Sequence, residues 1–259
     1  MDWHYSLSGL LVGVIVGMTG VGGGSLMTPL LVMVFGVSPA TAIGTDLVYA
    51  GLTKAAGSVT RHRLGSVNWR VAALLAIGSV PAALATTWML SHLVPYGSSM
   101  GKVLTVALGG ALVLSALALV FKSRLQRYAA RKTGFLKREP ARHVIPTTIL
   151  VGALLGVLVT TTSVGAGALC AIALLLLYPQ LPTNHIAGTD IVHAVPLTLV
   201  AGAGHAFAGT VDYGLLGTLL IGSLPGIVIG SLVAHRLPEP LLRQALAAVL
   251  FAVGCKLVI

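Results

Sequence analysis

The stretch Thr19-Gly20-Val21-Gly22-Gly23-Gly24-Ser25 interrupts a long, mainly apolar run near the start of the chain. Glycine lowers helix stability by about 1 kcal/mol relative to alanine, so four glycines in five residues predict a break between two helical arms. Inside a membrane, exposed backbone is tolerated only where it is buried in protein or lines a wet cavity. The stretch is therefore a candidate binding site.

The composition is that of a membrane protein. Of 259 residues, 56% are hydrophobic and only 8% are charged, whereas a soluble domain carries about 25% charge. An all-α polytopic membrane protein is predicted, because helices satisfy their own backbone groups in lipid. No cleaved signal peptide is expected at the N-terminus. Cys170 and Cys255 lie in apolar stretches and indicate neither a disulfide framework nor a metal knuckle, so neither a metal nor a cofactor is expected.

The net charge of +10 is concentrated in one place. Basic residues between two apolar segments are typical of a cytoplasmic loop near anionic lipid, and we expect no nucleic-acid partner. This pattern divides the chain into a first membrane repeat (1–121), a basic cytoplasmic linker (122–143) and a second membrane repeat (144–259). Half of the 16 basic residues lie in the linker: Lys122, Arg124, Arg127, Arg131, Lys132, Lys137, Arg138 and Arg142.

The chain contains an internal repeat of about 144 residues. Gly44-Thr45-Asp46 recurs as Gly188-Thr189-Asp190, and the first glycine-rich break corresponds, at an offset of 143, to a second break at 161–168. Such repeats characterise secondary transporters. Ser38-Pro39 is a helix start, with serine as N-cap and proline at the first helical position. Eight segments are predicted: 6–36, 39–59, 69–94, 101–121, 144–178, 183–208, 213–235 and 240–259.

Loop charges favour an inverted relation between the two copies. The turn after 39–59 is basic, whereas its counterpart at 209–213 has no Lys or Arg; for the turn after 69–94 the bias is reversed. Inversion requires this swap of sides. The predicted fold is thus two inverted repeats, each a re-entrant or broken helix plus three transmembrane helices. Full spanning by 6–36 and 144–178, with parallel copies, is the alternative.

Inversion would bring the two breaks together near the bilayer midplane. Free N–H groups and helix dipoles there stabilise an anion by roughly 0.3–2 kcal/mol each, and hydroxyl groups add donors. The alternative is that the glycines only permit close helix packing. The candidate substrate-binding residues are Thr19, Gly20, Gly22, Gly23, Gly24, Ser25, Thr28, Thr45, Lys54, Thr161, Thr162, Ser163, Gly165, Gly167 and Thr189.

Ionisable residues within the apolar segments are costly in lipid and therefore suggest function. Lys54 is a candidate for attracting the anion, unless it extends to the inner surface. Asp46 and Asp190 occupy equivalent positions and would repel an anion unless protonated, so they are candidates for proton coupling together with His193. The alternative is that the carboxylates hold the broken helices by bonding freed N–H groups.

The first break, followed by Pro29, Gly36, Pro39 and Gly44-Thr45, resembles the sulfite exporter TauE/SafE family. A weaker second copy carries Gly165, Gly167 and Gly188-Thr189. The resemblance covers nearly the whole chain. It implies a transporter, not an enzyme, in the bacterial inner membrane. Its substrates would be small sulfur-containing anions such as sulfite, thiosulfate or organosulfonates. Protons as coupling ions and a homo-oligomeric state remain open.

Two other functional classes are compatible with parts of the sequence. His185 to Asp190 fits the H-x4-D pattern, which resembles nickel/cobalt permeases, so divalent transition-metal transport is the main alternative. Copy one has Thr41 at the histidine position, which weakens this interpretation. An intramembrane hydrolase using Ser25 and His205 is a third class. It leaves the repeat without a role.

Overall fold

The computed structural model describes residues 3–19, 24–63, 65–93, 98–133, 143–233 and 239–258, and the described residues form helices joined by short connections. Their lengths and apolar character follow the segments predicted from the sequence. The helices are α1 (Trp3–Thr19), α2 (Gly24–Met33), α3 (Pro39–Arg63), α4 (Trp69–Leu93), α5 (Ser98–Thr133), α6 (Val144–Thr162), α7 (Ala168–Leu177), α8 (Thr183–Phe207), α9 (Tyr213–Val233) and α10 (Glu239–Val258).

The predicted helix breaks and starts are confirmed. The segment 6–36 is divided into α1 and α2, and the segment 144–178 into α6 and α7. Helix α3 begins at Pro39, and the Thr41 amide donates to Ser38 Oγ at 3.3 Å, as expected of a serine N-cap.

The basic linker differs from the expected loop in its first half. Helix α5 continues through it to Thr133. Its Lys, Arg, Gln, Leu and Ala residues all have high helix propensity, and no glycine or proline occurs between Gly110 and Gly134. Helix propensity therefore prevails over the polarity that suggested a loop.

Five described helices are long and apolar enough to cross a membrane, lying within α4, α5, α6, α8 and α9. The two arms of each broken segment are unequal. Helix α6 has 19 residues and is about 28 Å long, close to the thickness of the hydrocarbon core. Helices α2 and α7 have 10 residues each, about half that length. The first arms are thus longer than the half-hairpins expected from the sequence.

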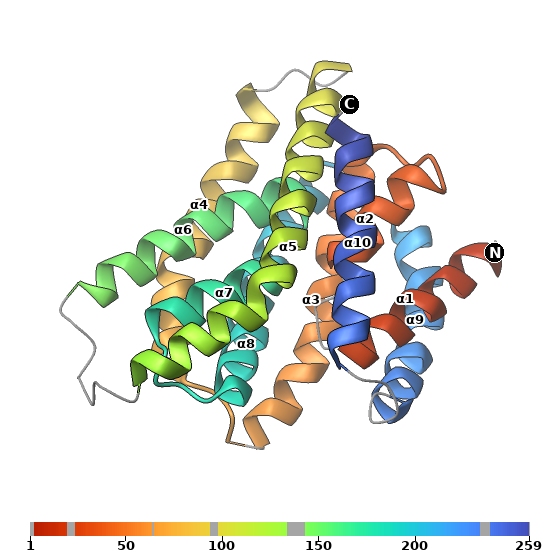
Figure 1. Ribbon diagram of the computed structural model, residues 1–259. Helices are drawn as coiled ribbons and strands as arrows, with labels where there is room; N and C mark the ends of the chain where they lie inside the picture. The colour runs from red at the N-terminus through yellow and green to blue at the C-terminus, as the bar shows by residue number, and fades with distance from the viewer. Residues whose placement is uncertain are drawn as a thin grey trace.

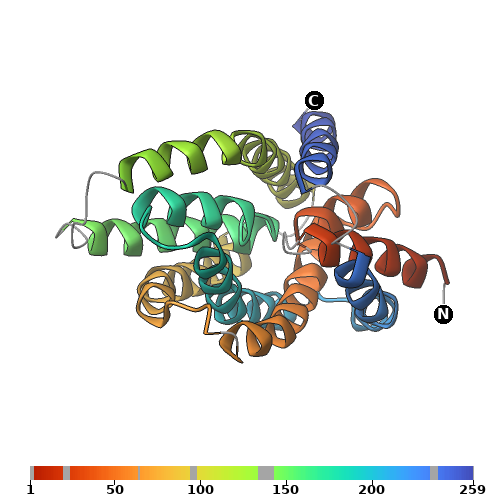
Figure 2. The ribbon, with the colours of Figure 1, turned by 60° about the horizontal axis from the view of Figure 1, so that its bottom comes forward.

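The two halves pack on each other reciprocally. Figures 1 and 2 show α4 and α6 on one flank, α1 and α9 on the other, and α3 and α8 between them. Helix α1 of the first half packs on α9 of the second, and α6 of the second half packs on α4 of the first. Both contacts use equivalent glycines. A Cβ on Gly222 would lie 1.8 Å from the Ser6 carbonyl oxygen, and one on Gly78 would lie 2.0 Å from that of Ile149.

A second reciprocal contact joins the halves through equivalent threonines. The Asp212 amide donates to Thr45 Oγ1 at 3.0 Å, and the Asn68 amide donates to Thr189 Oγ1 at 2.9 Å. Thr189 is the counterpart of Thr45, and Asp212 is the counterpart of Asn68, both at the offset of 144 residues, so the two contacts are the same with the halves exchanged. Contacts of this self-complementary kind are what a twofold relation produces. The internal repeat predicted from sequence is therefore expressed in the packing.

Candidate functional site

The first break lies largely outside the described residues. Gly20, Gly22 and Gly23 fall between the end of α1 at Thr19 and the start of α2 at Gly24. Thr19, Gly24 and Ser25 are placed at these helix ends. The first side chain of the predicted site that can be located in this half is Thr28, which is fully buried on α2.

The second break is a tight, buried turn. Ser163 has a left-handed backbone with φ of 57°, and Gly165 has φ of 112°. A left-handed conformation costs a non-glycine residue roughly 1–2 kcal/mol, and such residues concentrate at functional sites. The amide of Cys170, in the first turn of α7, donates to the Gly165 carbonyl at 3.2 Å. The positive end of the α7 dipole therefore lies at this break.

Lys54 connects the centre of the molecule to the second break. It lies on α3, is only 8% exposed, and its Nζ donates to the backbone carbonyl of Ala166. The ammonium group is thus held inside the protein at the turn between α6 and α7. A positive charge therefore stands beside the interrupted helix.

The two equivalent aspartates are both buried in this region. Asp46 accepts a hydrogen bond from the Thr28 hydroxyl through Oδ2, and Ser163 is a neighbouring side chain. Asp46 Oδ1, Asp190 Oδ1 and Ser163 Oγ are buried without a hydrogen-bond partner among the described residues. Lys54 lies close enough to interact electrostatically with both carboxylates. The structure thus brings residues of both repeats into one polar cluster inside an apolar molecule.

His193 lies at the end of this cluster in the second half. Its Nε2 is 2.9 Å from Ser79 Oγ, and its Nδ1 is 3.8 Å from Cys170 Sγ. The ligand atoms of Cys170, Asp190 and His193 all lie within 4.8 Å of one another, and all three residues are buried. The predicted pairing of Asp190 with His193 therefore gains a third member from α7.

The equivalent place in the first half has different chemistry. Tyr49 stands where His193 stands in the second half, and Met27 corresponds to Cys170. Tyr49 is buried beside Ser223, the counterpart of Ser79. The scaffold is shared by the repeats, and its side chains have diverged.

Four predicted threonines have other partners for their hydroxyl groups. Thr161 Oγ1 donates to the Val157 carbonyl at 2.9 Å, and Thr162 Oγ1 donates to the Leu158 carbonyl at 2.6 Å. Thr45 and Thr189 accept the amides that join the halves. Their role in binding a substrate stays a prediction.

The structure places three residues of the two other functional classes, namely His185, Asp190 and His205. His185 and Asp190 are five residues apart on α8, which places them about 140° apart around the helix. The imidazole of His205 is bonded at both nitrogens, to the Thr160 carbonyl at 3.0 Å and to Thr210 Oγ1 at 2.9 Å. Both ring nitrogens of His205 therefore take part in hydrogen bonds within the protein.

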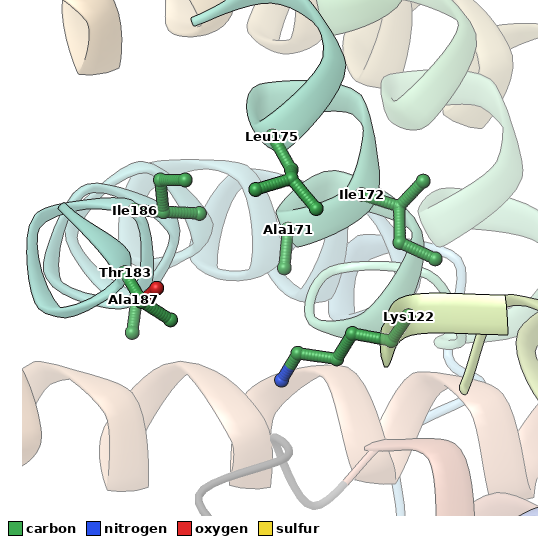
Figure 3. A pocket seen from close by; sticks show the side chains of 7 residues that line it. All are labelled: Lys122, Ala171, Ile172, Leu175, Thr183, Ile186 and Ala187. Atoms are coloured by element: carbon green, nitrogen blue, oxygen red, sulfur yellow. The ribbon is translucent and has the colours of Figure 1, made fainter. Parts of the chain in front are cut away.

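A small pocket opens between α5, α7 and α8, next to the cluster. Figure 3 shows Lys122 extending from α5 toward α8, across from the apolar side chains of α7. Ala171 adjoins Cys170 in sequence, and Lys122 is near enough to Asp190 to interact with its charge. The pocket is lined by Lys122, Ala171, Ile172, Leu175, Thr183, Ile186 and Ala187.

Sequence reasoning missed Ser79, Ala166 and Cys170 as members of the cluster. Ser79 lies in Gly78-Ser79-Val80-Pro81, which recurs 144 residues later as Gly222-Ser223-Leu224-Pro225. This recurrence could have identified Ser79 as a candidate site residue. Ala166 contributes only its backbone carbonyl, and the identity of a residue does not indicate whether its carbonyl accepts a hydrogen bond from a distant side chain. Cys170 is 23 residues from His193, and only the packing of α7 on α8 brings them together.

Comparison with known proteins gives consistent results. The family model described as sulfite exporter TauE/SafE matches residues 5–257. A probable membrane transporter protein of Bacillus subtilis, YjnA, is 39% identical over 97% of this chain and 98% of its own. A second one, YdhB, is 26% identical over 91% of both chains. A probable membrane transporter protein of Xylella fastidiosa is 28% identical over 95% of this chain and 91% of its own. No solved structure gives a significant match.

Proposed function

Because this chain belongs to the sulfite exporter TauE/SafE family and is a multi-pass bacterial membrane transporter, we propose that its substrates are small sulfur-containing anions. Sulfite, thiosulfate and organosulfonates carry the negative charge that the buried ammonium group of Lys54 attracts. The anion would bind between the two helix breaks, near the middle of the bilayer. The buried cluster at the second break supports this position.

The observation that carries the proposal is the hydrogen bond from Lys54 to the Ala166 carbonyl. A buried ammonium group is costly in lipid and is retained where it has a function. Here it stands beside a helix N-terminus, another source of positive potential. The Ser163 hydroxyl lies in the same cluster and can donate to an anion's oxygens, whereas the Thr28 hydroxyl donates to Asp46. One fixed charge with weak donors beside it binds an anion without trapping it.

The two aspartates suggest how transport is coupled. With Asp46 and Asp190 ionised, the cluster carries two negative charges against the single positive charge of Lys54. An arriving anion then meets net repulsion, which protonation of one carboxylate removes. We therefore infer that a proton accompanies the anion, with Asp46, Asp190 and His193 as its candidate carriers.

Transport by reconstituted protein tests the proposal directly. Lys54→Met should reduce the initial rate of labelled sulfite or thiosulfate flux into proteoliposomes by roughly tenfold or more, which corresponds to about 1.4 kcal/mol of lost stabilisation of the bound anion. Lys102→Met, at an exposed position on α5, is the matched control and should transport at the wild-type rate.

The outcomes separate the substrate from the site. Flux of the anions that is unchanged in Lys54→Met would refute the site while leaving the substrate class intact. Wild-type protein that moves none of the sulfur anions but moves Ni²⁺ or Co²⁺ would refute the substrate class in favour of the cation alternative.

A further inference from the structure

We propose that Cys170, Asp190 and His193 form a binding site for a borderline-soft divalent metal ion of the zinc type. The three side chains come from α7 and α8, and their ligand atoms lie within 4.8 Å of one another. Thiolate, imidazole and carboxylate are the three ligand classes that zinc takes in proteins. The site differs from the His185–Asp190 pattern considered above, of which only Asp190 is shared.

The distances are close to those of a metal site. Zinc–sulfur and zinc–nitrogen bonds of about 2.3 and 2.05 Å at a tetrahedral angle place the two ligand atoms about 3.6 Å apart. Cys170 Sγ and His193 Nδ1 are 3.8 Å apart. A rotation of the Asp190 side chain toward these two atoms would complete a three-ligand site. Its open fourth position would hold water or a transported anion.

The surroundings orient the ligands as metal sites require. The Ser79 hydroxyl lies 2.9 Å from His193 Nε2 and can accept a hydrogen bond from the Nε2–H group, which leaves the Nδ1 lone pair directed at Cys170. Asp190 is 7% exposed, and its Oδ1 has no hydrogen-bond partner in the described structure. A buried carboxylate oxygen without a partner is costly, and a bound cation would supply that partner.

Charge balance permits the ion despite the neighbouring lysine. A thiolate and a carboxylate neutralise a divalent cation, which leaves Lys54 to be balanced by Asp46. The first half offers an internal contrast. There the positions of Cys170 and His193 are taken by Met27 and Tyr49, so the two repeats differ at the residues that would bind the metal. With Asp190 and His193 engaged by the ion, Asp46 is left as the proton carrier.

Titration of the purified, metal-free protein in detergent with Co²⁺ tests the inference independently of transport. Wild-type protein should bind one equivalent of Co²⁺, show thiolate-to-cobalt charge-transfer absorption, and lose it when Zn²⁺ is added. Cys170→Ser should abolish the charge-transfer band. His193→Gln and Asp190→Asn should each weaken Co²⁺ binding by at least roughly tenfold, as loss of a ligand requires.

Two controls keep the result interpretable. Cys255→Ser removes the other cysteine, which is partly exposed on α10, and His92→Gln removes an exposed histidine; both should retain the band and the stoichiometry. Absence of a thiolate–cobalt band in wild-type protein would overturn the proposal whether or not any variant folds. Persistence of the band in Cys170→Ser would overturn it as well.

Discussion

At the residue scale, the cluster depends on a few groups that the fold holds in costly states. Ser163 combines a left-handed backbone with a buried hydroxyl that lacks a hydrogen-bond partner among the described residues. Lys54 has its ammonium group hydrogen-bonded to the backbone carbonyl of Ala166. Groups held in this way can exchange their weak interactions for stronger ones with a ligand.

Ser163 allows the contributions of its backbone and its hydroxyl to be separated. Ser163→Ala and Ser163→Gly both remove the hydroxyl, and both should weaken anion binding, by about 1 kcal/mol or roughly fivefold in KM for transport. Only glycine relieves the left-handed strain, so Ser163→Gly should have the higher thermal midpoint of the two. Wild-type KM in both variants would show that the hydroxyl does not contact the anion.

Asp46 is the residue at which proton coupling can be tested. Asparagine keeps the size of the side chain and its acceptor for Thr28, but it cannot release a proton. In Asp46→Asn proteoliposomes, anion flux down its own gradient should persist, whereas the acceleration of flux by an imposed pH gradient should be lost. Asp212→Asn is the control, because this exposed residue at the start of α9 uses an oxygen to accept the Leu215 amide, which asparagine also provides.

Equal acceleration of Asp46→Asn and wild-type protein by the pH gradient would exclude Asp46 as the proton carrier. If Asp46→Asn shows no flux under any gradient, the carboxylate has instead a structural role and holds α2 against α3.

At the scale of elements, glycine has two separate uses in this chain. At the second break it permits backbone that helices cannot adopt, as Gly165 shows with its φ of 112°. Within α4, α6 and α9 it permits neighbouring helices to approach until backbone touches backbone, the mode of packing that membranes favour. Close packing thus accounts for the glycines within these helices, and the anion-binding role of the break glycines stays a prediction.

Helix α9 provides a matched pair of substitutions for the packing role. A Cβ on Gly222 would lie 1.8 Å from the Ser6 carbonyl oxygen, whereas one on Gly217 would meet nothing within 4 Å. Gly222→Ala should therefore separate α9 from α1 and cost about 1–3 kcal/mol, seen as a lower thermal midpoint in detergent. Gly217→Ala should leave the midpoint unchanged or raise it. An unchanged midpoint in Gly222→Ala would contradict the close packing.

At the scale of the whole molecule, the reciprocal contacts between the halves are compatible with an inverted repeat. Loop charge predicts the orientation, with the basic linker expected on the cytoplasmic side. Under inversion, the 122–142 linker and the 235–243 turn share one face of the membrane. Under parallel repeats they lie on opposite faces.

Single cysteines distinguish the two topologies. The background carries Cys170→Ser and Cys255→Ser, and one cysteine is introduced at Gln126 or at Pro238. Both single cysteines should react with a membrane-impermeant maleimide added outside inverted vesicles, which expose the cytoplasmic face, and neither should react from the other side. A cysteine at Gly97, in the turn that inversion places outside, is the control and should react from the opposite side. Labelling of Gln126 and Pro238 from opposite faces would exclude inversion.

The sequence by itself determined the membrane class, the family, the two broken segments and the bounds of most helices. These features depend on the length of the apolar segments, the glycine content, the helix caps and the offset of 144 residues. All of these can be determined from the sequence of one chain. The extension of α5 to Thr133 differs from the predicted loop, although its helix formers are equally local, because the basic charge of this stretch is also typical of a loop.

Only the tertiary structure decided which polar groups meet. The bond from Lys54 to Ala166 crosses 112 residues, and that between Ser79 and His193 crosses 114. The proximity of Cys170 to His193 requires α7 to pack on α8. Such contacts depend on the crossing of helices in three dimensions, and hydropathy and spacing along the chain contain no information about that crossing.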